Sequence, residues 1–291
     1  MTSIPNSSTG QAVPNSSGTA PPALKAPANA ADCHIHIYDP RFQPLVAKPL
    51  NGAVQDYRLL QKRIGVSRVV IVQPRNYVTD NGVTLDAIRQ FGIANARGVA
   101  VIRPTVTDAE LRMLHDGGVR GIRFTVGNPE TAAVSIDMIE PLAKRIAEFG
   151  WHVQLNMDAA QIVDNADLLR RLPTQIVFDH MGKPPLPAGT AHPSHAVIRS
   201  LLDQRRAWVK ISGAYMNTQV GPPGYADAAP IAQAFVKAAP ERCVWGSDWP
   251  HPGPKVHPDD AALFDLLGTW APDDATRNRI LVANPETLYG F

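Results

Sequence analysis

The sequence is poor in cysteine, has no long apolar run and shows no excess of either charge. Its 291 residues include only two cysteines, Cys33 and Cys243. Two are too few for a disulfide framework, so we expect reduced, buried thiols and a cytoplasmic location. No apolar run approaches the roughly 18 residues of a membrane-spanning helix, so no membrane span is expected. The 28 basic and 26 acidic residues give a net charge of +2 without any basic cluster, which argues against a nucleic-acid partner.

The first 30 residues differ in composition from the rest of the chain. Range 1–30 is rich in Ser, Thr, Pro, Gly, Asn and Ala, and its only charged side chain is Lys25. It has neither the basic start nor the apolar run of a secretory signal. Such a segment has few apolar groups to offset the entropy lost on ordering, so we expect it to be disordered. The predicted fold is then a single domain over 31–291.

From residue 31 onward, short apolar runs alternate with longer stretches of helical periodicity. Near-continuous apolar runs are typical of parallel strands that are covered on both faces. The expected strands are 32–37, 68–73, 98–103, 121–126, 152–156, 175–180, 208–212 and 243–248. The clearest amphipathic helices between them are 55–65, 80–92, 108–118, 139–150 and 166–172.

This alternation predicts an α/β fold, a single (β/α)8 barrel of the TIM type. A doubly wound sheet is the alternative, but no GxGxxG motif or P-loop follows the first strand, which weakens its nucleotide-binding version. No nucleotide or organic cofactor is therefore expected. Because active sites of such barrels lie at the C-terminal ends of the strands, polar residues there are candidate site residues.

Ionisable side chains stand at several of these strand ends. His34 and His36 are one residue apart, so in a strand both point to the same face. His180 ends the sixth expected strand and Asp248 ends the eighth. A lone histidine in an apolar run is more often a core residue than a site residue. Three histidines and a carboxylate at one rim favour an active site.

Two mechanisms are open for this set of catalytic candidates, His34, His36, His180 and Asp248. In the first they bind a metal, at most one zinc ion, which polarises a carbonyl group or lowers the pKa of bound water. In the second no metal takes part: the imidazoles donate hydrogen bonds to a carbonyl oxygen, and Asp248 is the general base on water. Hydrolysis of an ester or lactone is the natural reaction in both.

Further candidates at the same rim indicate what the substrate carries. Arg75, Arg123 and Lys183 lie at strand ends or just beyond, and together they favour an anionic substrate unless they pair with acidic residues of the protein. Candidate hydrogen-bonding residues for the substrate are Asn156, Tyr215 and His251. For His251, support of Asp248 is the alternative role.

Four segments resemble the amidohydrolase superfamily, and more narrowly its lactonase branch. They are "DCHIHIYDP", "VFDHMGKP", "VWGSDWPHP" and the terminal "ANPETLYGF". The resemblance implies a distorted (β/α)8 barrel in which His34, His36, His180 and Asp248 form the site and the aspartate activates water. Two-metal members of the superfamily also need a bridging ligand on strand 4 and a histidine on strand 5. This chain has Arg123 on strand 4 and Gln154 and Asn156 on strand 5. The resemblance therefore implies one metal ion or none.

The resemblance also bears on the substrate. "RGIRF" matches the branch members that act on pyrone dicarboxylate and implies that Arg123 binds a substrate carboxylate. Asn156, Lys183 and Arg75 depart from the residues of those members, so the anion-binding set is rearranged. We therefore expect a hydrolase that opens an anionic lactone in aromatic-compound catabolism, with 4-sulfomuconolactone or a related muconolactone or pyrone carboxylate as the best candidate. The alternative is a sugar-acid lactonase or a lactone isomerase such as D-galactarolactone isomerase. Monomer and homo-oligomer both stay open.

Overall fold

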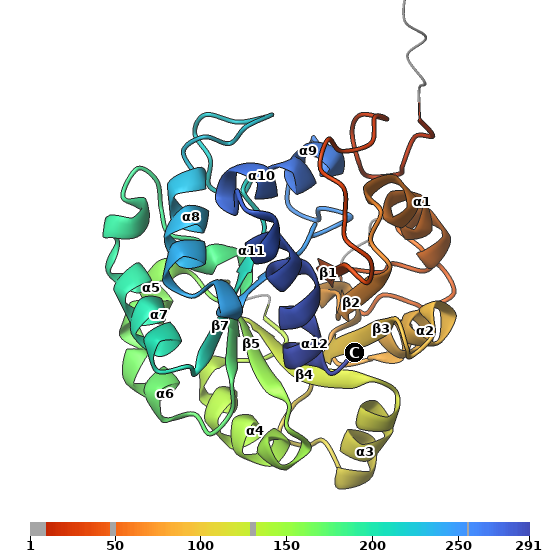
Figure 1. The fold of residues 1–291 in the computed structure, drawn as a ribbon. Helices are drawn as coiled ribbons and strands as arrows, with labels where there is room; N and C mark the ends of the chain where they lie inside the picture. Colours follow the sequence, from red (N-terminus) through yellow and green to blue (C-terminus); the bar gives the residue numbers. More distant parts are fainter. Residues whose placement is uncertain (1–9, 47–50, 129–131, 255) are drawn as a thin grey trace, which may run out of the picture.

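A computed structural model describes residues 10–46, 51–128, 132–254 and 256–291, and its centre is a barrel of parallel strands (Figure 1). Neighbouring strands in the sheet are also neighbours in the sequence. The strands are β1 (Ala31–Ile35), β2 (Arg68–Val72), β3 (Ala96–Ala100), β4 (Val119–Thr125), β5 (His152–Asn156), β6 (Ile176–Phe178), β7 (Ala207–Ile211) and β8 (Cys243–Trp245). The predicted eight-stranded barrel is thus confirmed, with strand bounds close to those expected.

The barrel closes between β1 and the segment that follows β8. The backbone N–H of Asp248 donates to the carbonyl oxygen of His34 at 2.8 Å, and the N–H of His36 donates to that of Trp249 at 2.8 Å. The closing hydrogen bonds therefore hold together the two motifs that contain the candidate catalytic residues.

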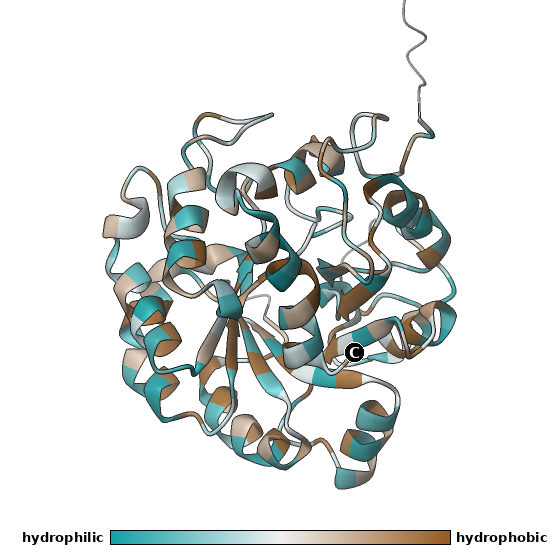
Figure 2. Ribbon diagram, in the orientation of Figure 1, coloured by the Kyte–Doolittle hydropathy of each residue, from teal (hydrophilic) through white to brown (hydrophobic). Residues whose placement is uncertain are grey.

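The helices surround the strands (Figure 1). Most of them contain both hydrophobic and hydrophilic residues (Figure 2). They are α1 (Val54–Ile64), α2 (Gly82–Phe91), α3 (Asp108–Asp116), α4 (Ile139–Ile146), α5 (Ala159–Asp164), α6 (Ala166–Arg171), α7 (Pro193–Asp203), α8 (Ala229–Ala238), α9 (Asp260–Asp265), α10 (Leu267–Trp270), α11 (Asp274–Asn278) and α12 (Asn284–Tyr289). Short 3-10 segments are η1 (Arg75–Tyr77), η2 (Ile136–Met138), η3 (Ala147–Phe149), η4 (Asp179–Gly182), η5 (Gly189–Ala191) and η6 (Pro240–Arg242), and η7 (Arg279–Ala283) is a π-helix. Among the described residues, no helix combines the length and the apolar character needed to cross a membrane.

Helix α1 shows how the sequence produces these elements. Val54, Tyr57, Leu60 and Ile64 recur at helical spacing, and all four are buried. Gly65 ends the helix in the left-handed region at φ 78°, a conformation that costs glycine little because it has no Cβ.

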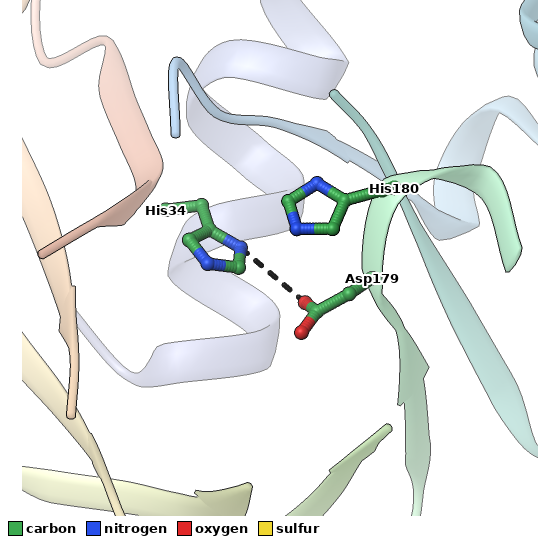
Figure 3. A group of neighbouring side chains, drawn as sticks. All are labelled: His34, Asp179 and His180. Carbon is green, nitrogen blue, oxygen red and sulfur yellow. Dashed lines mark ion pairs between the residues drawn. The ribbon is translucent and has the colours of Figure 1, made fainter. Parts of the chain in front are cut away.

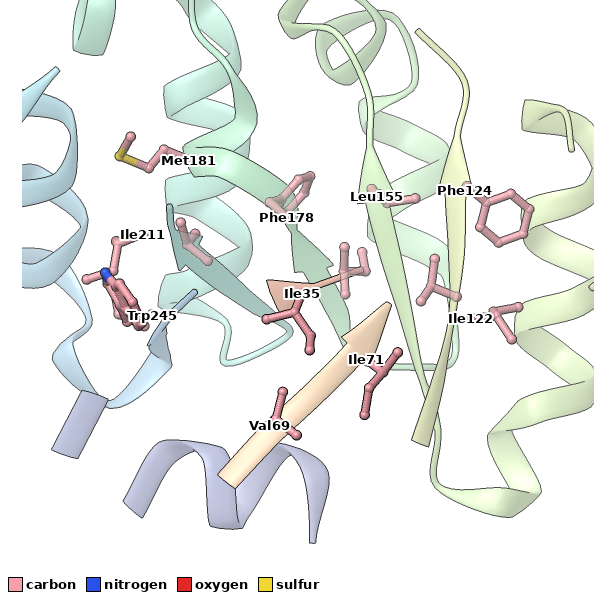
Figure 4. Packing of buried hydrophobic residues seen from close by; sticks show 14 of the residues in the cluster. Ile35, Val69, Ile71, Ile122, Phe124, Leu155, Phe178, Met181, Ile211 and Trp245 are labelled. Atoms are coloured by element: carbon pink, nitrogen blue, oxygen red, sulfur yellow. The ribbon is translucent and has the colours of Figure 1, made fainter. Parts of the chain in front are cut away.

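Two apolar clusters hold the barrel together. One lies between strands and helices and includes Ile35, Ile71 and Phe124 (Figure 4). The other contains residues that alternate with these along the strands, such as Val70 and Val72, and so fills the barrel. Tyr289 of α12 belongs to this inner cluster, and its ring lies 5.4 Å from that of His152, the first residue of β5. The C-terminal helix therefore covers the end of the barrel opposite the candidate site.

The expectation of disorder over 1–30 differs from the structure at residues 10–30; residues 1–9 lie outside the described residues. Val13 is only 4% exposed, and Trp249 Nε1 donates to the carbonyl oxygen of Pro14 at 2.8 Å. The backbone N–H of Leu24 donates to Asp265 in α9 at 2.8 Å, and Arg63 of α1 donates to the carbonyl oxygen of Ala20 at 2.8 Å. These partners belong to the barrel, so the composition of the segment alone could not predict them.

Candidate active site

The four predicted catalytic residues meet at the C-terminal end of the barrel. His34 belongs to β1, His36 follows it, His180 lies in η4 directly after β6, and Asp248 follows β8. Oδ1 of Asp248 lies 3.4 Å from Nε2 of His34, 3.5 Å from Nε2 of His36 and 3.7 Å from Nε2 of His180. All four side chains are buried. One carboxylate oxygen therefore faces three imidazoles in a site screened from bulk water.

The backbone at this site adopts a costly conformation. His180 has φ 49° and Asp248 has φ 66°, in the left-handed region that non-glycine residues seldom occupy. Such backbone persists where the surrounding structure holds it in place, and it is concentrated at functional sites. For Asp248, the hydrogen bond from its backbone N–H to the carbonyl oxygen of His34 stabilises this conformation.

Burial sets the protonation states of the cluster. It lowers the pKa of His34 well below 6.5 and that of His180 to about 4. Burial alone would raise the pKa of Asp248, but the imidazoles of His180, His36 and His34 outweigh it and hold the pKa below its ordinary range. At neutral pH the site therefore contains an ionised carboxylate beside neutral His34 and His180, the state that a general base on water requires.

A second charged network lies beneath His34. Nδ1 of His34 is 3.3 Å from Oδ1 of Asp179, and Figure 3 shows the two side chains facing each other with His180 alongside. Arg123 Nε donates to Oδ2 of the same carboxylate at 2.9 Å, and Lys210 Nζ lies 3.7 Å from its Oδ1. Burial alone would raise the pKa of Asp179, but Arg123, His34 and Lys210 hold it well below the usual range.

Lys210 is one of the site residues that sequence reasoning missed. It is fully buried in β7, and Nζ donates to Gln154 Oε1 at 2.8 Å and to the carbonyl oxygen of Cys33 at 2.9 Å. Burial lowers its pKa to about 8, with Asp179 acting in the opposite direction. The signal was present in "WVKIS", because a lysine inside an apolar strand is rarely buried without charged or polar partners.

A cavity of about 420 Å³ opens onto the cluster. His36, His180 and Asp248 line it together with three of the predicted substrate-binding residues, Arg75, Arg123 and Asn156. Two cavities of about 530 and 490 Å³ lie elsewhere, share Arg103 in their lining and contain none of the catalytic candidates. The 420 Å³ cavity is therefore the candidate substrate site.

The other three predicted substrate-binding residues lie away from this lining. Lys183 Nζ is 3.2 Å from Oδ1 of Asp158, so it pairs with an acidic residue of the protein. Tyr215 lies on the other side of Asp248, where its hydroxyl donates to Oδ2 at 2.5 Å. His251 Nδ1 is 3.1 Å from the same hydroxyl, which places it behind Tyr215. Burial and then Asp248 raise the pKa of Tyr215 well above 10, so its hydroxyl keeps its hydrogen.

The donor set fits one metal ion. Among the described residues, ligand atoms of His34, His36 and Asp248 all lie within 4.8 Å of one another, and so do those of His34, Asp179 and His180. Nε2 of His34 has no hydrogen-bond partner within the part of the chain that the structure describes. Nδ1 of His36 donates to the carbonyl oxygen of Val72 at 2.8 Å. The lone pair of Nε2, which points toward the cluster, is then available to bind a metal ion. Imidazole and carboxylate are ligands that zinc accepts.

A second ion at the deeper group is disfavoured by charge. Asp179 is already paired with the guanidinium of Arg123 at 2.9 Å, and the ammonium of Lys210 lies 3.7 Å away. The positive charges of Arg123 and Lys210 would repel a second metal ion bound to Asp179.

The barrel and its histidine–aspartate cluster define a hydrolase-type site, and the comparison with known families agrees. Residues 31–291 match the model of the amidohydrolase family, and the chain belongs to that family. The resemblance predicted from the sequence motifs is thus confirmed.

Several relatives match over nearly the whole chain. The chain is 34% identical to a 2-pyrone-4,6-dicarboxylate hydrolase of Comamonas testosteroni, over 92% of this chain and 92% of the relative. It is 34% identical to a 4-sulfomuconolactone hydrolase of Rhizobium radiobacter, over 94% and 93%, and to a D-galactarolactone isomerase of Agrobacterium fabrum, over 94% of each. A crystal structure of an Agrobacterium tumefaciens protein in apo form is similar at a TM-score of 0.85 and 31% identity, over 95% of this chain and 98% of that one.

Proposed function

We propose that this protein is a lactonase that opens an anionic lactone with water activated by Asp248. The observation that carries the proposal is the position of Oδ1 of Asp248, 3.4 to 3.7 Å from three imidazole nitrogens at a cavity lined by Arg75 and Arg123. The two hydrolases that match at 34% identity are named for lactones that carry carboxylates or a sulfonate, which supports an anionic substrate.

Asp248 is the group that moves the proton. Its carboxylate takes a proton from a water molecule while the water oxygen bonds to the lactone carbonyl carbon. The ring C–O bond then breaks, and Asp248 returns the proton to the leaving ring oxygen. The product is the open-chain hydroxy acid or its tautomer, and no other reactant is needed.

His180 is placed to stabilise the charge that develops on the carbonyl oxygen. Its Nδ1 lies 2.9 Å from the hydroxyl of Ser212. In the tautomer that we propose, this hydroxyl donates to Nδ1 and the ring hydrogen is on Nε2. An N–H fixed toward the cluster is the kind of donor that binds an oxyanion. An ion held by His34, His36 and Asp248, with His180 beside them, would add Lewis-acid polarisation of the carbonyl group. Metal analysis of the purified protein gives the ion content, for which we propose one zinc per chain at most.

Arg75 and Arg123 bind the anionic group of the substrate in this proposal. Both line the cavity, and Arg123 is oriented by its Nε contact to Asp179. Guanidinium groups suit carboxylates and sulfonates because they donate two parallel hydrogen bonds. The best candidate substrate remains 4-sulfomuconolactone or a related muconolactone or pyrone carboxylate.

A lactone isomerase is the second candidate function. Asn76, Thr125 and Asn156 line the same cavity and offer partners for substrate hydroxyls, and one relative is named as a D-galactarolactone isomerase. An isomerase would transfer the acyl group to a hydroxyl of the same substrate, without adding water. Isotope incorporation from water separates the two reactions, as described at the end of the Discussion.

Replacing Arg75 with Met tests whether the substrate is anionic. We expect KM for carboxylated or sulfonated lactones to rise about 10-fold or more while kcat changes little, because the lost interaction binds substrate and transition state alike. Steady-state kinetics with an anionic lactone and a neutral lactone of similar size provide the measurement. Equal KM changes for both lactones, or none for either, would contradict an anion-binding role. Arg89→Met is the control, since Arg89 pairs with Asp86 on the surface of α2.

A further inference from the structure

We propose that Tyr215, His251 and Asp260 form a positioning relay that fixes the orientation of the Asp248 carboxylate. The proposal deepens the proposed function and rests on Asp248 being its general base. Tyr215, expected from the sequence to bind substrate, and His251, for which support of Asp248 was the alternative expectation, act on this base from behind. Asp260 is added to the set.

The relay is a continuous chain of side-chain contacts. The Tyr215 hydroxyl donates to Oδ2 of Asp248 at 2.5 Å. Because that hydroxyl has one hydrogen, its oxygen then accepts from Nδ1–H of His251 at 3.1 Å. Nε2 of His251 lies 3.1 Å from Oδ1 and 3.2 Å from Oδ2 of Asp260. Because Nδ1–H donates to Tyr215, the contact to Asp260 is a hydrogen bond when Nε2 also carries a hydrogen, which makes it an ion pair between an imidazolium and a carboxylate. In that form Asp260 holds His251, His251 holds Tyr215, and Tyr215 holds Asp248.

The outer members of the relay are buried as completely as the catalytic group. His251 and Asp260 are both 0% exposed, and Asp248 is 1% exposed. Burying a carboxylate costs free energy unless the carboxylate has polar partners. The buried carboxylate of Asp260 contacts His251, which indicates that this contact is its role. His251 also adopts a left-handed backbone with φ 59°, which brings its ring to this position.

The N-terminal segment holds the outer end of the relay. The backbone N–H of Asp260 donates to Ser16 Oγ at 3.3 Å. Asp259, the N-cap of α9, pairs with Arg63 of α1. The start of α9 is therefore held between α1 and the segment over residues 10–30. These contacts fix the backbone position of Asp260.

The relay assigns different tasks to the two oxygens of Asp248. Tyr215 holds Oδ2, while Oδ1 faces the three imidazoles. Without Tyr215 the carboxylate can turn about its Cβ–Cγ bond and lose the alignment with water and the lactone carbonyl. A misplacement of about 1 Å can lower a rate by about 10²-fold. Since substrate contacts lie elsewhere in the cavity, the loss should fall on kcat and leave KM almost unchanged.

Tyr215→Phe and Asp260→Asn, alone and together, test the relay with a lactone that the wild-type protein hydrolyses. We expect Tyr215→Phe to lower kcat by about 10- to 100-fold and Asp260→Asn by about 10-fold, with KM within about threefold of wild type. The double variant should lose little more than Tyr215→Phe alone, because both changes interrupt one chain of contacts. A merely structural role would not produce this non-additivity.

Tyr289→Phe is the matched control. Tyr289 is also fully buried, its hydroxyl has no hydrogen-bond partner among the described residues, and it lies at the opposite end of the barrel. Wild-type kcat in Tyr215→Phe, or losses that multiply in the double variant, would overturn the relay.

A crystal structure of Tyr215→Phe keeps this test separate from the proposed function. If the wild-type protein hydrolyses no lactone, the proposed function fails, but the orientation of Asp248 is still measurable. The relay predicts a carboxylate turned away from the Oδ1-to-imidazole arrangement. A carboxylate that keeps its distances to the three Nε2 atoms within about 0.3 Å, a spread typical of hydrogen-bond lengths, would contradict it.

Discussion

Asp248→Asn should lower kcat for lactone hydrolysis by about 10²-fold or more, the usual contribution of a general base. The amide cannot take a proton from water, although it is nearly identical in shape to the carboxylate. The three imidazoles would then surround a neutral group, and no other carboxylate is described within the same contact distance of all three. Steady-state kinetics with the best lactone substrate measure the effect.

The fold should tolerate Asp248→Asn, which makes the loss of activity interpretable. The amide oxygen can still accept from Tyr215, and replacing a buried charge with a neutral group removes a desolvation cost. We therefore expect a thermal midpoint close to that of the wild type. A variant that retains more than about a tenth of wild-type kcat, well short of a general-base contribution, would rule out Asp248 as the base.

Lys210→Met should have the largest effect on stability. Lys210 is fully buried, and its ammonium contacts Gln154 and lies near the carboxylate of Asp179. Removing one partner from a buried ionic network leaves charge without compensation and commonly costs about 3 to 5 kcal/mol. Arg123 still pairs with Asp179, so we expect about 3 kcal/mol, the lower end of that range.

The same change should also reduce activity, because His34 loses the neighbour that lies 3.4 Å from its Nδ1. Urea unfolding of the wild type and the variant measures the free energy of unfolding. Lys144→Met is the control: Lys144 forms a surface pair with Glu140, and exposed pairs contribute about 1 kcal/mol or less. Equal effects of the two substitutions would show that the Lys210 network contributes nothing beyond an ordinary surface contact.

The barrel and the position of its candidate catalytic cluster could be predicted because both follow from periodic patterns. Apolar runs fixed the strands to within a few residues, and the ends of parallel strands must meet at one rim. The sequence therefore predicts that His34, His36, His180 and Asp248 lie together, and their side chains meet around Oδ1 of Asp248. The same rule brought Arg75 and Arg123 to the cavity.

Where the position of a residue differs from the predicted one, that position depends on the path of a loop. Tyr215 follows a strand, as substrate-binding residues do, but its loop turns it to the far side of Asp248. His251 lies behind it, where its alternative role, support of Asp248, applies. Nothing in the spacing of the sequence encodes that turn. Residues 10–30 were expected to be disordered because few of them are apolar, yet Trp249, Asp265 and Arg63 supply partners from distant parts of the chain.

Lactone turnover in water labelled with oxygen-18 tests the central claim most directly. The wild-type protein is incubated with sulfonated, carboxylated and polyhydroxylated lactones, and the products are analysed by mass spectrometry. Attack of Asp248-activated water predicts one labelled oxygen in the new carboxylate of an anionic product, and loss of this labelling in Asp248→Asn. A product that forms without label and keeps the mass of its substrate would show isomerisation, and would contradict the account of this protein as a lactone hydrolase.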